Sequence, residues 1–323
     1  MQQAIQLKES RCGIFFALII GCLAFFIRGV TANPLLDPLF VALLIGIMVN
    51  SFVPIPQRFR AGIRISPSLF IPVGVVLYGC VNLKFEIFHQ IKSDYIFLIL
   101  FIFIVYIISV LFLSSLFKIK EKISYLLTTG SAICGASAII IASKAIDADS
   151  DEVSISLVPV FISGIIGLFV ILPFLQGYLN MANNDYAVLS GSTLQFTGFV
   201  KVAARSLPVD MANLAISVKA VRYTGLLFLV PLFASFSKGR LHVPWYLWGF
   251  LAGGLAFTFF PGIEFLRPVL KVILTLFWSI AMAAIGLSAN IKNIFSPQGV
   301  KALIVSCVSF LLVVGIFLLA IQI

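Results

Sequence analysis

Apolar residues are gathered into long runs along the chain, separated by short polar loops. A helix needs about 20 apolar residues to cross a bilayer, so each long run is a candidate membrane span. The expected fold is an all-α polytopic membrane protein in which 1–323 forms a single transmembrane domain. We predict about eleven spans, at residues 13–31, 35–53, 66–83, 95–117, 124–143, 153–177, 187–204, 211–236, 245–261, 269–289 and 301–322.

The charges in the loops predict an orientation. Four basic clusters fall on one side of the predicted spans, and by the positive-inside rule this side faces the cytoplasm. They are Lys8 with Arg11, Arg58 with Arg60 and Arg64, Lys118 with Lys120 and Lys122, and Lys238 with Arg240. With eleven spans, the acidic loop of Asp147, Asp149, Asp151 and Glu152 is expected on the opposite side.

The composition agrees with a membrane protein. Hydrophobic residues make up 61% and charged residues 11% of the chain, whereas soluble proteins have about 25% charged residues. The net charge of +10 sits in short loops, so it indicates membrane orientation rather than nucleic-acid binding. The five cysteines are isolated, and we find no metal-ligand spacing, cofactor fingerprint or catalytic motif.

A weak internal repeat is visible. Leu77 to Lys84 and Ala284 to Lys292 each place a Gly, then an Asn and a Lys at a helix exit, and each leads into a charge-free run. The odd number of spans between them predicts inverted halves at about 35–177 and 187–322, a common transporter plan. The alternative is two ordinary helix ends that use Gly and Asn as caps.

Two predicted spans are rich in small and hydroxyl residues. Thr128 to Ala138 is either a site of close helix packing or a helix interrupted inside the membrane, where half-helix ends form a substrate site. Leu189 to Gly198 has the same character, and its alternative is an amphipathic surface helix that leads to the next span. An amide at membrane depth needs a polar partner. The candidate site residues in these spans are Gly130, Ser131, Cys134, Gly135, Ser137, Ser192, Thr193, Gln195 and Thr197.

A pair of cations lies inside another span. Lys219 and Arg222 are three residues apart, on one helix face, well within the run 211–236. Each charge costs about 2.5–3.5 kcal/mol at the bilayer centre, so both are expected to face protein or water. All 12 acidic residues fall in predicted loops or helix ends. Buried cations without a mid-membrane carboxylate favour an anionic substrate.

The residues resemble a known family. Gly130 to Ala138 is similar to the G-S-S-I-C-G-A-A-A signature of bacterial inner-membrane proteins that carry the provisional name of sulfate exporters. Matches follow in order from about residue 40 to the C-terminus, at Leu77-Tyr78-Gly79, Gly191-Ser192-Thr193, Lys219-Ala220-Val221-Arg222 and Ala281 to Leu287.

The resemblance implies a sulfur oxyanion as substrate and a fold like the bile-acid/sodium symporters, with inverted repeats and two discontinuous helices that cross near the centre. The spans 124–143 and 187–204 are the candidates for this pair. Family members carry His-Glu where this chain has Gln195-Phe196. An amide and an aromatic ring therefore replace a titratable pair.

Together these features predict a secondary transporter for a small anion in a bacterial plasma membrane, with the bilayer as its surroundings and no cofactor, metal or nucleic acid. The expected substrate site contains the nine residues above together with Lys219 and Arg222. Family analogy adds a homodimer. Two alternatives stay open. One is an anion channel, and the other is a membrane enzyme or assembly subunit, for which only His89 and His242 are available as catalytic residues.

Overall fold

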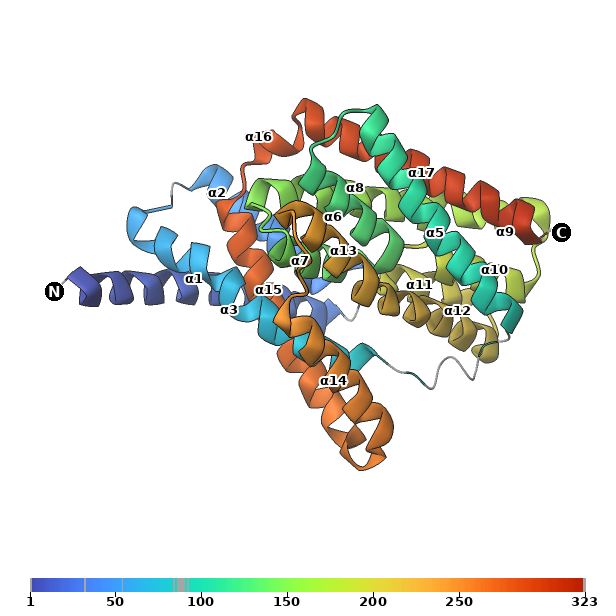
Figure 1. Ribbon diagram of the computed structural model, residues 1–323, viewed down its shortest axis with the longest axis horizontal. Coiled ribbons are helices and arrows are strands. Elements are labelled where there is room, and N and C mark those ends of the chain that lie inside the picture. Colours follow the sequence, from blue (N-terminus) through green and yellow to red (C-terminus); the bar gives the residue numbers. More distant parts are fainter. Residues whose placement is uncertain are drawn as a thin grey trace.

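The structure, a computed structural model, describes residues 2–31, 33–53, 55–83, 85, 91 and 93–321. Within these ranges every regular element is helical. His89, one of the two histidines named above, lies outside the described residues. Figure 1 shows the N-terminus and the C-terminus at opposite ends of the longest axis.

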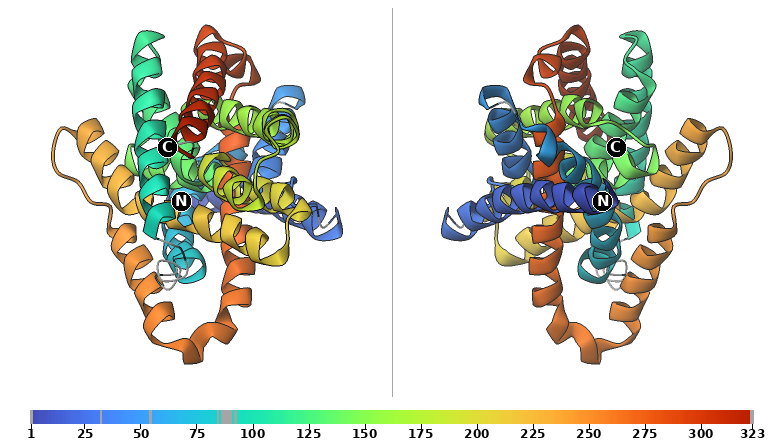
Figure 2. Two further views of the ribbon diagram at one scale, coloured as in Figure 1. Left: turned by 90° about the vertical axis from the view of Figure 1, so that its right-hand side faces the viewer. Right: turned by 90° about the vertical axis from the view of Figure 1, so that its left-hand side faces the viewer.

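Five helices pack mainly against one another and form what we call the first bundle. Glycines allow the backbones to approach closely, because a Cβ at Gly46 would lie 2.6 Å from the carbonyl oxygen of Ala283. Figure 2 shows α14 and α15 converging at the short η5 turn (Pro261–Leu266). The helices of the first bundle are α1 (Gln2–Thr31), α2 (Pro38–Phe52), α3 (Gln57–Asn82), α14 (Trp245–Phe259) and α15 (Arg267–Ser288).

The remaining long helices form the second bundle, which contacts the first mainly through α7 and α8. The short α16 (Ile291–Ile294) joins α15 to α17. The second bundle consists of α5 (Ser93–Leu116), α6 (Glu121–Thr129), η1 (Gly130–Cys134), α7 (Ala136–Ala145), α8 (Ser150–Ile166), η2 (Gly167–Ile171), α9 (Leu172–Leu179), α10 (Asn183–Thr193), α11 (Thr197–Ala203), η3 (Ala204–Ser206), α12 (Val209–Val221), η4 (Arg222–Gly225), α13 (Leu226–Lys238) and α17 (Pro297–Ile321).

The helix lengths confirm a polytopic α-helical membrane protein. Within the described residues, seven helices are long and apolar enough to cross a bilayer. They are Arg11–Thr31, Gln57–Asn82, Asp94–Leu116, Ser150–Leu179, Val209–Lys238, Gly262–Ser288 and Pro297–Ile321. Two more predicted spans are the shorter apolar helices α2 and α14. The last two, 124–143 and 187–204, are interrupted.

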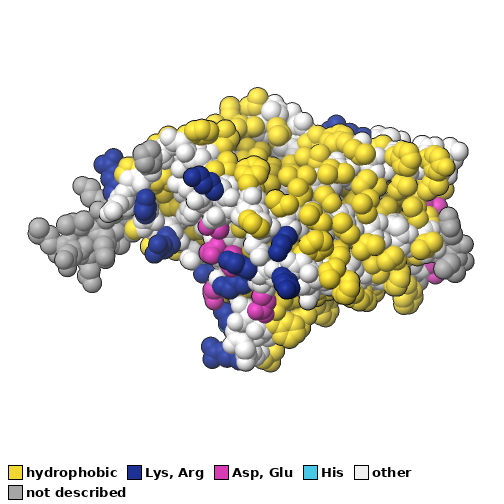
Figure 3. Space-filling view, turned by 90° about the horizontal axis from the view of Figure 1, so that it is seen from above, with side chains coloured by type: hydrophobic (Ala, Val, Ile, Leu, Met, Phe, Trp, Pro, Cys, Tyr) yellow, Lys and Arg dark blue, Asp and Glu magenta, His cyan; other side chains and the backbone are white. Residues whose placement is uncertain are grey.

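The outer surface is apolar over wide areas. On α5, the exposed side chains include Phe97, Ile104, Ile108 and Phe112. In water such a surface would drive aggregation, whereas lipid tails solvate it. Figure 3 shows a broad hydrophobic surface next to a region where Lys, Arg, Asp and Glu side chains gather.

The acidic loop lies on the same side as the basic clusters, so its predicted placement was wrong. The ammonium group of Lys122 donates to the carbonyl oxygen of Asp147 at 2.7 Å, and Lys238 pairs with the Asp147 carboxylate at 3.4 Å. The segment from α6 to α7 therefore enters and leaves at the same end of the molecule. It turns back at Gly135, where the sequence pattern had suggested a crossing.

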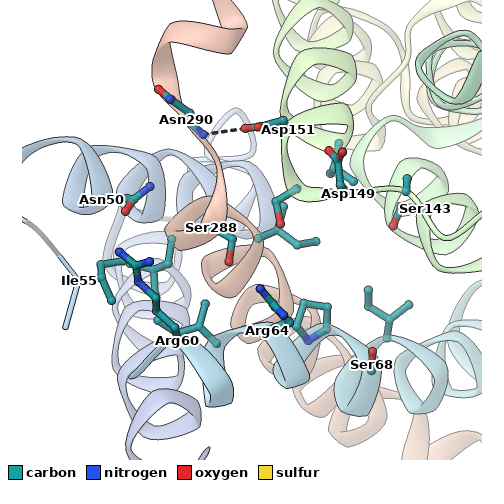
Figure 4. A pocket seen from close by; sticks show the side chains of 18 of the residues that line it. Asn50, Ile55, Arg60, Arg64, Ser68, Ser143, Asp149, Asp151, Ser288 and Asn290 are labelled. Atoms are coloured by element: carbon teal, nitrogen blue, oxygen red, sulfur yellow. Dashed lines mark hydrogen bonds between the residues drawn. The ribbon is translucent and has the colours of Figure 1, made fainter. Parts of the chain in front are cut away.

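Asp151, in the first turn of α8, ties the two bundles together. Its Oδ1 accepts from the backbone N–H of Asn290 at 2.7 Å, and its Oδ2 accepts from the side-chain amide of Asn293 at 2.6 Å. Figure 4 shows the contact with Asn290. Both partners follow α15 of the first bundle, so one carboxylate fixes the corner between α15 and α16 to α8.

We predict that Asp151→Ala lowers the free energy of unfolding by about 1–3 kcal/mol, because two donors lose a charged acceptor. The melting temperature of the purified protein in detergent measures this effect. Asp210→Ala is the matched control, since Asp210 lies in a helix first turn but makes no side-chain hydrogen bond or ion pair with any described residue. Equal melting temperatures for the two variants would contradict the proposed tie.

Candidate functional site

The first interruption lies between α6 and α7. The hydroxyls of Thr128 and Thr129 bond to carbonyl groups one turn earlier, which favours bending of the helix. The chain then widens into a single π-helical turn, and Gly135 follows with φ 65° and ψ −124°. An L side chain is strained at such a positive φ. Glycine therefore makes the reversal into α7 possible.

The second interruption separates α10 from α11. Residues Leu194 to Phe196 are extended, with φ and ψ of −63° and 138° at Leu194 and −100° and 137° at Phe196. The Phe196 ring closes against the first interruption, because a Cβ at Gly135 would lie 2.7 Å from it. The two discontinuous helices therefore meet at their interruptions, as the resemblance implies.

Lys219 joins the two interruptions. Its side chain is fully buried, and its ammonium group donates three hydrogen bonds, which use all of its protons. The acceptors are the carbonyl oxygens of Ile133 at 2.7 Å, Leu194 at 2.6 Å and Gln195 at 2.7 Å. One residue from α12 thus binds the last carbonyls of both broken helices.

Arg222 repeats this arrangement one turn later. Its guanidinium is 2% exposed and lies 5.6 Å from the centre of the Tyr106 ring. It donates to the carbonyl oxygens of Ser131 at 2.6 Å, Ala132 at 2.7 Å, Leu194 at 2.9 Å and Gly191 at 3.2 Å. Carbonyls at the end of a helix lack partners within the helix. Lys219 and Arg222 therefore act as C-terminal caps for two half-helices.

The centre has a positive balance of charge. Neither Lys219 nor Arg222 has a carboxylate partner among the described residues, where the ion pairs are Lys238–Asp147 and Arg267–Glu264. Each helix C-terminus contributes about half a negative charge, and each N-terminus about half a positive charge. Two cations and two capped C-termini leave about one positive charge, to which the N-terminus of α7 adds.

The structure brings the other predicted site residues to the same centre. Ser131 Oγ and Gln195 Oε1 are buried and have no hydrogen-bond partner among the described residues. Gln195 Nε2 donates to the hydroxyls of Tyr106 at 2.9 Å and Ser163 at 3.3 Å. Two polar atoms at the interruptions therefore have unused hydrogen-bonding capacity within the described part of the chain.

The remaining predicted residues shape the interruptions. Ser192 and Thr193 bond to the Leu189 carbonyl within α10, so their hydroxyls are engaged. Thr197 shares a 2.7 Å hydrogen bond with Tyr223, and Cys134 accepts one from Tyr78 at 3.4 Å. Gly130 leaves room for Ile139, and Ser137 is half-buried at the start of α7.

An aromatic wall from the first bundle covers the centre, which the sequence did not reveal. The Tyr78 ring lies 5.0 Å from Trp278 and 5.7 Å from Tyr223, measured between ring centres. The indole of Trp278 donates to the carbonyl of Ile71 at 3.4 Å. In the sequence, only the run Leu77-Tyr78-Gly79 pointed to a residue of this wall, and it did so through the family resemblance.

On the other side of this wall, a cavity of about 930 Å³ opens between the bundles. Its lining includes the acidic loop on one side and Arg60 on another, with open space between them. Ile71 belongs to its lining, so Trp278 lies directly behind it. Ser143 also lines the cavity and is six residues from Ser137 along α7, a separation of about 9 Å in a helix. The cavity therefore ends within about two helical turns of the interruptions.

The amino-acid sequence that builds this site also matches a known protein family. Residues 12–306 match the family described as conserved hypothetical protein 698. The chain belongs to this family. Relatives that are named as membrane proteins match this chain over most of their own length.

A UPF0324 membrane protein of Archaeoglobus fulgidus is 31% identical over 91% of this chain and 87% of its own. Similar proteins from Bartonella henselae and Listeria monocytogenes are 30% and 27% identical, over 98% and 86% of this chain and 93% and 85% of their own. Among solved structures, no significant match was found. The relatives' names and the long apolar helices agree on a membrane location.

We predict that Gly135→Ala destabilises the protein by about 1–3 kcal/mol, because alanine is strained at positive φ and its Cβ collides with the Phe196 ring. Gly177→Ala is the control, since a Cβ at Gly177 meets nothing within 4 Å. In that exposed helix alanine is expected to be neutral or stabilising by about 0.5–1 kcal/mol. Thermal unfolding in detergent compares the two, and similar losses would show that Gly135 has no special conformational role.

Proposed function

We propose that this protein is a secondary transporter that moves a small anion, such as a sulfur oxyanion, across a bacterial plasma membrane by alternating access. The observation that carries the proposal is the buried pair of Lys219 and Arg222. Both cations bind only carbonyl groups, without a carboxylate partner among the described residues. In a medium of low dielectric, an anion at this centre is strongly favoured over a cation.

The cations act through charge, while other groups supply direct contacts. All three Lys219 protons are engaged, and four of the five Arg222 protons are engaged. The Ser131 hydroxyl lies in the same turn as two of the four carbonyls that Arg222 binds, and it has no partner within the described residues. It is the donor that we assign to the anion.

The two-bundle architecture supports alternating access as the mechanism. The helices pack mainly within each bundle, so one bundle can move against the other. The Tyr78 and Trp278 wall separates the centre from the cavity in the present conformation. A small relative motion of the bundles would withdraw this wall from Cys134 and connect the two spaces.

We predict that a small divalent oxyanion raises the melting temperature of the purified protein, because a ligand that binds only the folded state stabilises it by about 2.7 kcal/mol at a hundredfold excess over Kd. The screen compares sulfate, sulfite, thiosulfate, phosphate, chloride, taurine and an organic cation at equal ionic strength. A shift with the organic cation alone would contradict an anion site. Exchange of labelled anion in liposomes then separates saturable transport from the steady conductance of a channel.

Ser131→Ala tests the assigned contact without disturbing the fold. Removing a buried hydroxyl that has no partner is expected to leave the ligand-free melting temperature unchanged or slightly higher. The anion-induced rise in melting temperature should become smaller. Loss of about 1.4 kcal/mol of binding free energy corresponds to about a tenfold loss of affinity. Ser279→Ala is the matched control, because Ser279 Oγ is also buried without a partner but lies on α15. Equal anion responses in both variants would rule out Ser131 as a ligand contact.

A further inference from the structure

The cavity between the bundles carries a row of basic side chains. Arg60 and Arg64 line it four residues apart on α3, and Ser68 follows after another four, so the three side chains share one face of this helix. Lys144 at the end of α7 and Lys292 on α16 line other parts of it. Figure 4 shows Arg60 and Arg64 rising from their helix toward the open space.

The acidic residues in the same lining are engaged elsewhere. The Asp151 carboxylate uses both oxygens on Asn290 and Asn293. Asp149 caps the N-terminus of α8 by accepting from the backbone of Glu152 at 2.8 Å. Asp147 pairs with Lys238, which lies outside the cavity lining. Asp147 therefore has a counter-ion from outside the lining, while Asp149 and Asp151 are held by neutral donors and keep their negative charge.

The two arginines have no such partner. Both are exposed, and neither makes an ion pair or a side-chain hydrogen bond with any described residue. Lys144 donates to the Ser68 hydroxyl at 3.1 Å, a contact that leaves its charge uncompensated. The lining holds four cations and three carboxylates, and one of these carboxylates is paired with Lys238 from outside the lining. The surplus of charge is therefore positive, and it is concentrated where the two unpaired arginines lie together on α3, so this face of the cavity favours anions.

We propose that Arg60 and Arg64 form a capture site for a small divalent oxyanion, of the sulfate or hydrogen phosphate class, which binds there before it reaches the buried interruptions. Two guanidinium groups one helical turn apart can each offer paired N–H donors to such an anion. Part of this inference, the passage onward to Ser131, rests on the proposed transport function. The capture site itself is independent of it.

The position of the cavity also indicates on which side of the membrane the capture site lies. It opens at the end of the molecule that holds Arg58, Lys122 and Lys238, the residues of the basic loops. By the positive-inside rule this end faces the cytoplasm. The capture site therefore collects anions from the cytoplasm, which is the direction required for export.

The test uses a cysteine reporter, so it needs no transport assay. Ser288→Cys places a thiol in the cavity lining, at an exposed position. The Ser288→Cys reporter is made in a background where Cys12, Cys22, Cys80 and Cys307 are replaced by alanine. Cys134 is kept because it is buried, with 4% of its surface exposed. Two methanethiosulfonate reagents of equal chemistry are compared, one with a sulfonate and one with a trimethylammonium group.

We expect the sulfonate reagent to modify the reporter about tenfold faster than the cationic one, because the local potential raises its concentration. The double variant Arg60→Gln/Arg64→Gln should remove this preference. Arg58→Gln is the matched control, since Arg58 lies on the same helix over the Phe59 ring and does not line the cavity. An unchanged preference in the double variant, or an equal loss in the control, would overturn the proposal.

Competition distinguishes a site from a diffuse potential. Sulfate, thiosulfate and phosphate should slow the sulfonate reagent in a saturable way, and chloride at equal ionic strength should not. Equal protection by chloride, or protection only by phosphatidylglycerol, would refute a site for a soluble dianion. Melting temperatures of all variants establish that they fold. If dianions protect the reporter but no anion is exchanged in liposomes, the capture site stands and the transport proposal fails.

Discussion

The structure depends on the capping of two helix ends by two cations inside the membrane. An unpaired carbonyl group and an unpaired ammonium group are each costly in a bilayer. At the interruptions each satisfies the other, since Lys219 and Arg222 together donate to six carbonyl groups from both broken helices. Without the cations the two interruptions could not lie side by side, and without the interruptions the cations could not be buried. This reciprocity explains why the polar segments and the charged pair occur together in one chain.

The capping also determines what remains for a ligand. Because the carbonyls are satisfied, the centre keeps a positive potential, and among the described residues the Ser131 hydroxyl and the Gln195 side-chain oxygen are left without hydrogen-bond partners. The aromatic wall of Tyr78 and Trp278 isolates this potential from the cavity, and isolation preserves it, because water would screen the charges. The cavity on the other side is polar and wide. The wall therefore marks the change from a polar, open space to the closely packed centre of the interruptions.

The sequence predicted those features that are local along the chain. Long apolar runs identified the helices, small residues identified both interruptions, and the spacing of Lys219 and Arg222 placed them on one face. Long-range contacts were not predictable. The carbonyl partners of Arg222 are 28 to 91 residues away, and no periodicity encodes them. The reversal at Gly135 was also missed, because a run of 20 apolar residues looks the same whether it crosses a bilayer or turns back. That error alone displaced the acidic loop to the wrong side.

The pair Gln195-Phe196 shows how the centre can work without a titratable group at this position. Gln195 keeps a donor for Tyr106 and Ser163, as an imidazole could, but it does not change charge near neutral pH. Phe196 replaces an acidic side chain with a ring that packs on Gly135. A carboxylate at position 196 would follow directly after the Gln195 carbonyl that Lys219 binds, and its charge would offset part of the charge of that cation. Its absence leaves the positive potential of the interruptions intact, and positions 195 and 196 hold no group that titrates near neutral pH.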